Sequence, residues 1–319
     1  MGSRARLSTS TPPAQRASRI GGKRPLRAPK PDREALELRT SDGISLSCTL
    51  HAPSKRSLGD VVLVHGAFSR QSSFTWSGGL ADFFRDAGYR VVTFDFRGHG
   101  KSGTAASRGG AWSYDDLVRR DLPAVVESLR SRRARGPLWV VGHSLGGHVA
   151  LAAQSTGRIE ADAIVTIGST LWREQNEPSR GLWLAKRLIL RGFVTTAERM
   201  GFFPARRFRL GSDDEALGYV RDLARMSKTT WRSADGEDDY DAGLGALTTP
   251  IYAIASRGDR LSANPAAVRS FHAPAAGVRF DFVDRAGDGG AAPTHAELVT
   301  TMKARDAFAR AVEFLRSRP

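Results

Sequence analysis

One serine of the chain stands in a pattern that could make it a nucleophile. Ser144 lies between two glycines, in the sequence GHSLG of residues 142–146. An apolar run typical of a strand, 138–141, precedes it, and residues 145–153 have the pattern of a helix. A serine on such a sharp turn needs small residues two positions before and after it, and the helix N-terminus favours developing negative charge. We predict that Ser144 is a nucleophile; the alternative is a solvent-facing serine in a glycine-rich turn.

A nucleophilic serine needs a histidine as its base and a carboxylate that orients the histidine. Asp259 follows the strand pattern of residues 251–255, and His295 follows the strand pattern of residues 278–283. Both fall at the carboxyl ends of predicted strands, where α/β sheets place catalytic groups. The chain order of serine, acid and histidine is the order that accompanies a G-x-S-x-G turn. We predict a catalytic triad of Ser144, Asp259 and His295.

Three other residues compete for these two roles. Asp284 and Asp288 could supply the acid, but aspartates at such positions are also typical of loop turns. His272 could supply the base, although it lies within a predicted helix. We prefer Asp259 and His295 because of their positions at strand ends.

The segment His65-Gly66-Ala67-Phe68 follows another buried strand pattern, residues 61–64. In this type of site, such a loop supplies one backbone donor to the oxyanion and the residue after the serine supplies the other. We predict that the two donors are the N–H groups of Ala67 and Leu145. The side chain of His65 is expected to brace the loop, since His295 is the better candidate for the base.

The order of elements predicts an α/β fold. A period-2 hairpin, residues 36–50, comes first, and short apolar runs then alternate with helical patterns as far as the closing helix at 302–316. Such alternation favours a mostly parallel central sheet with right-handed crossovers and helices on both faces. The helical pattern of residues 114–130 contains Pro123, which could kink or delay that helix.

Residues 171–247 interrupt the alternation and contain no convincing strand. We predict a helical cap inserted into one hydrolase domain of residues 34–319. Residues 171–211 hold nine basic and three acidic residues, net +6, whereas residues 212–249 hold four basic and nine acidic residues, net −5. The apolar residues of the cap could contact an acyl chain, or they could only pack the cap onto the core. The candidate substrate contacts are His143, Phe68, Trp183, Phe202 and Phe203.

The basic excess of the chain is concentrated at its start. Of the net charge of +15 over 319 residues, residues 1–33 contribute +8, with nine basic residues and one acid. Their polar composition predicts a disordered tail, which could be a solvated segment, a transit peptide or a weak contact to anionic surfaces. No nucleic-acid partner is expected. Cys48 is the only cysteine, so no disulfide within the chain can form, which fits a reducing compartment such as the cytoplasm.

Together these motifs resemble the α/β-hydrolase superfamily and, more narrowly, uncharacterised bacterial esterase- and lipase-like serine hydrolases. The resemblance covers about residues 35–319 and includes the segment DFRGHGKS of residues 95–102. In the family, that segment shapes a turn beside the active site, so we expect a structural role for it. The glycine-rich approach to the histidine, residues 287–293, departs from many relatives, which reach the histidine more directly.

The chemistry that this site predicts is hydrolysis of a carboxylic ester in two steps through an acyl-enzyme, on a small-molecule substrate with an apolar acyl or alcohol part. Neither a metal nor an organic cofactor is expected. Transfer of the acyl group to another acceptor, and hydrolysis of a thioester or peptide, remain alternatives on the same triad. A second alternative is a non-catalytic binding protein that acts through its basic tail. A haloalkane dehalogenase is disfavoured because its nucleophile would be an aspartate where Ser144 stands. The oligomeric state is left open.

Overall fold

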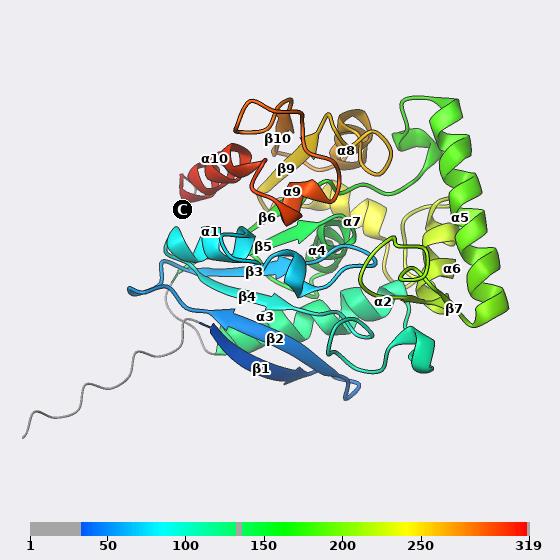
Figure 1. The fold of residues 1–319 in the computed structure, drawn as a ribbon, viewed down its shortest axis with the longest axis horizontal. Helices are drawn as coiled ribbons and strands as arrows, with labels where there is room; N and C mark the ends of the chain where they lie inside the picture. The colour runs from blue at the N-terminus through cyan, green and yellow to red at the C-terminus, as the bar shows by residue number, and fades with distance from the viewer. Residues whose placement is uncertain (1–32, 132–135, 318–319) are drawn as a thin grey trace, which may run out of the picture. The chain divides into compact units, whose positions relative to one another are not determined.

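The computed structural model describes residues 33–131 and 136–317. Their largest feature is an eight-stranded sheet in the order β1-β2-β4-β3-β5-β6-β9-β10 (Figure 1). Strands β3 to β6, β9 and β10 run parallel to one another, and β2 is antiparallel to β1 and β4. The predicted mostly parallel sheet is therefore confirmed. The strands are β1 (Arg33–Arg39), β2 (Ser45–His51), β3 (Asp60–Val64), β4 (Arg90–Phe94), β5 (Leu138–His143), β6 (Ala163–Ile167), β9 (Ile251–Ser256) and β10 (Val278–Val283).

Helices cover both faces of this sheet (Figure 1). Outside the insert described below they are α1 (Leu80–Asp86), α2 (Tyr114–Asp116), α3 (Leu122–Ser131), α4 (Leu145–Ser155), α8 (Pro265–His272), α9 (Glu297–Thr300) and α10 (Arg305–Arg316). Short 3-10 turns occur at η1 (Gln71–Ser73) and η2 (Ala106–Arg108). In the part of the chain that the structure describes, none of the helices combines the length and apolar character that a membrane span requires.

Alternate residues of the central strands face two different hydrophobic clusters. Val62 and Val64 of β3 pack in the cluster that includes α3 and α4, whereas Val61 and Leu63 pack in the cluster that includes α1 and α10. Every residue of β3, β5, β6 and β9 is buried, as the continuous apolar runs predict for strands covered on both faces. Each buried valine, leucine or isoleucine of these strands contributes roughly 1.5–3 kcal/mol to stability because its side chain leaves water. This burial holds the strand ends that carry the predicted site.

The first strand begins at Arg33, so the last residue of the predicted tail belongs to the sheet. The rest of that tail lies outside the described residues. The predicted hairpin forms, with Leu36 opposite Cys48 and a turn in which Gly43 has a φ of 83°. Glycine suits this position because it adopts positive φ at little cost.

The helical stretch around Pro123 is divided by a π-helical segment, η3 (Leu117–Asp121), that lies between α2 and α3. Ser113 begins the stretch with a capping box. Its hydroxyl accepts from the N–H of Asp116, and the Asp116 carboxylate accepts from the N–H of Ser113. Pro123 lacks an N–H and cannot make the usual hydrogen bond to the preceding turn. The predicted disturbance at Pro123 is thus found one turn earlier, as a widening of the helix.

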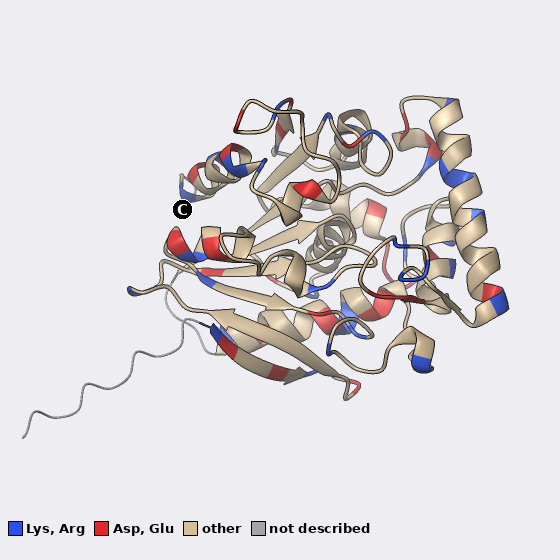
Figure 2. Ribbon diagram, in the orientation of Figure 1, with Lys and Arg blue, Asp and Glu red and all other residues tan. Residues whose placement is uncertain are grey.

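Between β6 and β9 the chain forms a separate set of elements, residues 171–247, called the insert below. They are η4 (Glu174–Asn176), α5 (Arg180–Met200), β7 (Phe202–Phe203), β8 (Glu215–Ala216), α6 (Leu217–Met226) and α7 (Tyr240–Ala246). The insert is mostly helical, but the expectation that it lacks strands is wrong, because β7 and β8 form a short antiparallel pair. Basic residues lie along α5 in Figure 2.

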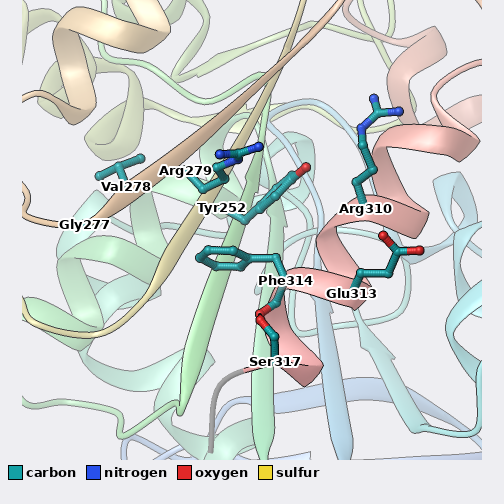
Figure 3. Close-up of a pocket in the computed structure, with 8 residues that line it drawn as sticks. All are labelled: Tyr252, Gly277, Val278, Arg279, Arg310, Glu313, Phe314 and Ser317. Carbon is teal, nitrogen blue, oxygen red and sulfur yellow. The ribbon is translucent and has the colours of Figure 1, made fainter.

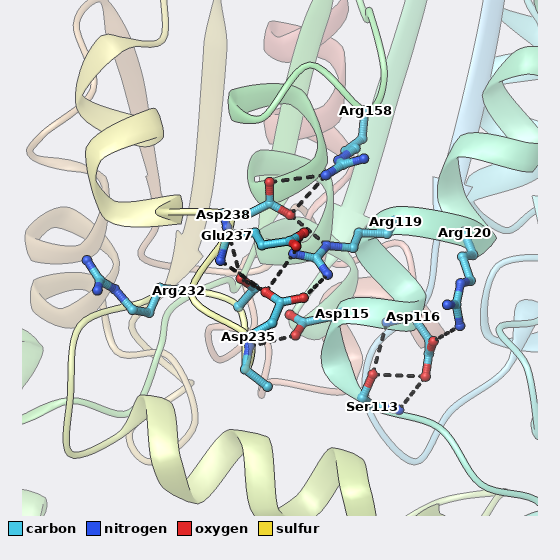
Figure 4. Close-up of polar contacts among 12 residues, drawn as sticks. Ser113, Asp115, Asp116, Arg119, Arg120, Arg158, Arg232, Asp235, Glu237 and Asp238 are labelled. Carbon is cyan, nitrogen blue, oxygen red and sulfur yellow. Dashed lines mark hydrogen bonds and ion pairs between the residues drawn. The ribbon is translucent and has the colours of Figure 1, made fainter.

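Ion pairs attach the insert to the rest of the domain (Figure 4). Arg119 of η3 lies 2.5 Å from the carboxylate of Asp235 and 2.6 Å from that of Asp238. Arg158, which follows α4, also contacts Asp238 at 3.3 Å. Nearby, Tyr240 donates to Asp115 of α2 at 2.8 Å in a buried hydrogen bond. The acidic half of the insert is therefore held by arginines of the hydrolase body.

Candidate active site

Ser144 lies at the turn between β5 and α4 with a backbone φ of 51° and ψ of −117°. A non-glycine residue rarely adopts this conformation, which costs about 1–3 kcal/mol and concentrates at functional sites. The glycines of the motif are required by close contacts: a Cβ on Gly142 would lie 2.4 Å from the backbone of Gly146, and a Cβ on Gly146 would lie 2.2 Å from the carbonyl oxygen of Val64. The Ser144 N–H donates to the carbonyl of Ile167 at 2.9 Å, which fixes the turn on the sheet.

The structure brings Asp259 and His295 together. The Nδ1 of His295 lies 2.5 Å from Oδ2 of Asp259, and the other carboxylate oxygen accepts from the N–H of Ser262 at 2.9 Å. Asp259 is only 3% exposed, whereas the His295 side chain is 24% exposed. Burial alone would raise the pKa of Asp259, but the hydrogen bond and the charge of His295 outweigh it, and the pKa is lowered. The carboxylate is thus suited to orient His295 and to stabilise its charged form.

The competing residues have other partners. His272 is buried in α8, where Nδ1 donates to the carbonyl of Val268 at 2.8 Å and Nε2 accepts from Thr166 at 2.9 Å. Burial lowers its pKa to about 4. Asp284 forms an exposed ion pair with Arg257, and Asp288 accepts the N–H of Gly290 within its own loop. These contacts agree with helix and loop roles for the three residues.

His143 connects the serine turn to the histidine loop. Its ring lies 4.8 Å from the ring of His295, centroid to centroid, and its Nε2 donates to the main-chain carbonyl of His295 at 3.1 Å. Burial, with a smaller contribution from His295, lowers the pKa of His143 to about 3. The expectation was a substrate contact, but the structure shows a neutral imidazole that contacts the main chain of the predicted base.

No hydrogen bond joins Ser144 to His295 among the residues that the structure describes. The two are close through their neighbours, because His143 precedes the serine and contacts His295 directly. Gly168 also lies close to the ring of His295, since a Cβ added at that position would be 3.3 Å from Nδ1. Catalytic hydrogen bonds are often long without substrate and tighten in the complex.

The loop after β3 lies against the serine turn. The Nδ1 of His65 donates to the carbonyl of Gly66 at 2.8 Å, and its Nε2 accepts the N–H of Phe96 at 3.0 Å, so His65 braces the loop. A Cβ on Gly66 would lie 3.1 Å from that of Ser144. Within the described residues, the N–H groups of Ala67 and Leu145 donate to no other part of the chain. The two N–H groups therefore remain the candidate donors to an oxyanion.

The aromatic residues that were expected to contact substrate have different surroundings. The ring of Phe68 lies 5.7 Å from that of Phe203 and 5.8 Å from that of Phe193. The insert therefore packs against the loop of residues 65–68, called the oxyanion loop below because Ala67 is a predicted oxyanion donor. Phe203 is only 2% exposed and Trp183 only 5%, so both mainly pack the insert. Phe202 is half-buried in β7. Only Phe68 is next to a predicted catalytic group.

The segment of residues 95–102 is a structural turn, as the resemblance implies. Asp95 accepts the N–H of Gln71 at 2.8 Å. Arg97 is buried and contacts Asp121 at 2.7 Å and Asp42 at 2.8 Å. The charged groups of Asp95 and Arg97 are thus occupied by contacts within the body of the protein.

Two cavities lie away from this site. One, of about 640 Å³, is formed by β9, β10 and α10 (Figure 3), near the starts of β9 and β10 and so at the opposite end of these strands from Asp259. The other, of about 340 Å³, is lined by the loop at Asp288 and by the start of α10. No group of three or more possible metal ligands occurs within residues 33–131 and 136–317.

Solved structures share the fold of this chain. An esterase from Pyrococcus furiosus aligns with a TM-score of 0.59 and 19% identity over 92% of this chain and 96% of that chain. An α/β hydrolase from Penicillium sp. sh18 aligns with a TM-score of 0.60 and 16% identity over 89% of this chain and 98% of that chain. These likenesses, together with the sheet order, define the chain as an α/β hydrolase in fold.

Residues 55–286 match the family model described as serine aminopeptidase, S33, and the chain belongs to that hydrolase family. It is 28% identical over 218 residues to a 2-hydroxy-6-oxononadienedioate/2-hydroxy-6-oxononatrienedioate hydrolase of Cupriavidus pinatubonensis, over 63% of this chain and 70% of that protein. It is 35% identical over 108 residues to protein phosphatase methylesterase 1 of Candida albicans. That match covers 34% of this chain and only 28% of the methylesterase.

Proposed function

We propose that this protein hydrolyses a carboxylic ester through a triad of Ser144, His295 and Asp259. The observation that carries the proposal is the contact of 2.5 Å between His295 Nδ1 and a buried Asp259, beside a serine in a strained turn. Hydrolase relatives and esterases of the same fold support the reaction class. Strained backbone at a non-glycine residue concentrates at functional sites, which supports a chemical role for this serine.

The first step is attack of Ser144 Oγ on the carbonyl carbon of the ester, while Nε2 of His295 takes the hydroxyl proton. Nε2 is the nitrogen for this role because Nδ1 is engaged by Asp259. The carbonyl oxygen becomes an oxyanion, which the N–H groups of Ala67 and Leu145 would stabilise. When the C–O bond breaks, His295 returns the proton to the leaving alcohol and the acyl group remains on Ser144.

The second step repeats this chemistry with water. His295 removes a proton from the water, the hydroxide oxygen attacks the acyl carbon, and the carboxylic acid is released as Ser144 regains its proton. Asp259 stays ionised throughout and stabilises the imidazolium that forms in each half-reaction. Every step uses only these side chains, the substrate and water.

The packing of Phe68 with Phe193 and Phe203 supports an ester with an apolar acyl or alcohol part. We infer that the insert acts as a cap over this side of the site. The family's description favours amide hydrolysis as a second candidate, since a serine aminopeptidase would use the same triad. Acyl transfer and thioester hydrolysis are further outcomes that only product analysis separates.

The experiment is a panel of p-nitrophenyl esters of increasing acyl length beside amino-acid p-nitroanilides. We expect ester hydrolysis that is lost in Ser144→Ala and retained in Ser131→Ala, a serine at the exposed end of α3. Hydrolysis of the anilides in preference to the esters would replace the esterase proposal by the peptidase one. Equal hydrolysis by Ser144→Ala and wild type would overturn the triad.

We also propose that the protein works in a reducing compartment such as the cytoplasm. The support is that Cys48, which is buried in β2, is the one cysteine of the sequence, so no disulfide can form within the chain. Fractionation of the source cells with an antibody to the chain would test this. The predicted contact of residues 1–33 with anionic surfaces concerns residues that lie outside the described structure apart from Arg33, and it stays a prediction.

A further inference from the structure

The insert reaches the oxyanion loop through one carboxylate. Glu215 of β8 accepts the N–H of Phe68 on Oε1 at 2.8 Å, and the same oxygen lies 3.2 Å from Nε2 of His99. The side chains of Glu215 and His99 are completely buried. Phe68 directly follows Ala67, whose N–H is the predicted oxyanion donor. A residue 147 positions away in the chain thus determines where the next amide of that loop lies.

The carbonyl of Phe68 is bonded to the insert as well. It accepts the N–H of Ser212 at 2.6 Å and that of Asp213 at 3.1 Å. Gly211 lies so close that a Cβ on it would be 2.2 Å from the same carbonyl oxygen. Phe68 has a φ of 60°, which is unfavourable for a bulky residue. Because both main-chain polar groups of Phe68 bond to the insert, the insert maintains this conformation.

The hydrogen bonds of His99 require both of its ring nitrogens to carry protons. Nδ1 faces the carbonyl of Arg97 at 3.0 Å, and Nε2 faces the carboxylate of Glu215, so both neighbours are acceptors. Burial opposes the positive charge, but Glu215 outweighs burial and raises the pKa of His99 to about 9. His99 and Glu215 therefore form a buried ion pair at neutral pH.

The other titratable groups around His99 do not replace this partner. Asp213 forms a two-bond ion pair with Arg70, at 2.7 Å for each bond. The ring of His65 lies 5.1 Å from that of His99, and burial holds the pKa of His65 well below its usual value, so it is neutral. Among the described residues, Oε2 of Glu215 has no hydrogen-bond partner. Among the described residues, His99 is the one cationic side chain that forms an ion pair with Glu215.

We propose that Glu215 is a positioning residue for the oxyanion hole: it fixes the Ala67–Phe68 peptide, and His99 neutralises its charge. The inference rests on the proposed function, since it assigns Glu215 a part in the same site. If the Phe68 N–H lost its hydrogen bond to Glu215, the loop could rotate, and the Ala67 N–H would no longer point toward the oxyanion. With His99 deprotonated, a buried negative charge would stand near the developing oxyanion and oppose it.

Two variants of Glu215 separate these effects. Glu215→Gln keeps an oxygen that can accept from Phe68 but removes the charge, and Glu215→Leu removes both. We expect Glu215→Leu to lower kcat by about 10- to 100-fold, less than deletion of an oxyanion donor, because the Ala67 N–H remains but is no longer held. KM should change by less than about threefold, since the loss falls on the transition state. Glu215→Gln should retain more of kcat.

The pH profile gives a readout that a purely structural role would not change. In the wild type, kcat should fall as pH rises through about 9, where His99 loses its proton. This fall should be absent in Glu215→Gln, in which no carboxylate is left uncompensated. The matched control is Glu198→Gln, an exposed glutamate of the same insert that contacts Arg221, and it should behave as wild type.

Hydrogen exchange of the peptide that contains residues 65–70 tests the contact without any activity. We expect faster exchange in Glu215→Leu than in the wild type or Glu198→Gln. If Glu215→Leu does not fold, the comparison of Glu215→Gln with wild type carries the kcat and pH tests. Unchanged exchange, or wild-type kcat and pH profile in both Glu215 variants, would overturn the inference. Faster exchange in a protein whose wild type hydrolyses no ester would support the contact and overturn the proposed function instead.

Discussion

The central sheet is held in place by apolar packing, whereas the insert is held by apolar packing together with ion pairs. Strands β3, β5, β6 and β9 are buried along their whole length and pack through apolar side chains. The insert also contacts the body and the site through ion pairs, which are Arg119–Asp235, Arg119–Asp238, Arg70–Asp213 and the fully buried His99–Glu215. Apolar burial does not depend on pH, whereas an ion pair does. The two regions should therefore respond differently to substitution and to pH.

This difference matters because each region positions another part of the site. The sheet positions Ser144, Asp259 and His295 through the backbone, since they follow β5, β9 and β10, respectively. The insert holds Phe68 through Glu215. It also contacts the loop that carries Asp259, because Nζ of Lys186 lies 3.4 Å from the carbonyl of Ser262. The proposed triad should be robust, while the oxyanion loop should be sensitive to changes in charge.

The largest effect should come from the sheet side, where backbone elements touch. We expect Gly146→Ala to abolish folding or to destabilise the protein by more than about 4 kcal/mol. The added methyl would lie 2.2 Å from the carbonyl oxygen of Val64 in β3. The control is Gly192→Ala in α5, where a Cβ meets nothing within 4 Å, and there the helix should gain about 0.5–1 kcal/mol. Urea unfolding measures both, and a wild-type midpoint for Gly146→Ala would contradict the account.

The next effect concerns the buried ion pair of the insert. Lys186 and Glu177 have fully buried side chains in contact, and Lys186→Met would leave the carboxylate without its cation. Loss of one partner of a buried pair costs about 3–5 kcal/mol, whereas apolar replacement of both is often neutral. We expect Lys186→Met with Glu177→Leu to be more stable than Lys186→Met alone. Equal destabilisation of both variants in urea unfolding would show that the pair does not hold the insert.

A smaller effect should appear as a dependence of stability on pH. The pKa of His99 is about 9 in the folded protein, whereas an ordinary histidine has a pKa of 6.5, so folding favours the protonated form. Its contribution should be fully present below about pH 6.5 and lost as pH rises through about 9. We expect the wild-type Tm to fall over that range by more than the Tm of His99→Gln. Parallel Tm curves for the two proteins would exclude a charged His99.

The smallest effect should come from an exposed ion pair of the same insert. Glu198 and Arg221 lie 3.1 Å apart with side chains about half exposed, at 47% and 57%. Exposed pairs contribute little because solvent screens them, so Glu198→Gln should change the free energy of unfolding by less than about 0.5 kcal/mol. A larger loss, measured by urea unfolding, would mean that exposure is a poor guide to the strength of the insert's ion pairs.

The sheet could be predicted from the sequence because its signals are local. Apolar runs of four to six residues, such as 61–64, stand between glycines and helical patterns, and each run became a strand. The pair β7–β8 could not be predicted, since two-residue strands carry no periodicity and form only through their tertiary neighbours. For the helical stretch around Pro123, the sequence predicted only a possible kink or delay, and not the π-helical segment that precedes this proline.

The site was predictable where motif and strand end coincide. Ser144, Asp259 and His295 each follow a strand, and the structure places Asp259 beside His295. The contacts of Glu215 with Phe68, and of His143 with the main chain of His295, span more than 140 residues and leave no local pattern. For His143, its place next to the serine suggested a substrate contact, and only the fold shows its partner.

Covalent labelling with a fluorophosphonate probe tests the central claim most directly, because the probe reacts with an activated serine. The comparison is wild type, Ser144→Ala and the control Ser131→Ala, each confirmed as folded by circular dichroism. The account predicts labelling of wild type and of Ser131→Ala at Ser144, and none of Ser144→Ala. Labelling that persists in Ser144→Ala, or its absence from a folded wild type, would contradict the proposed triad.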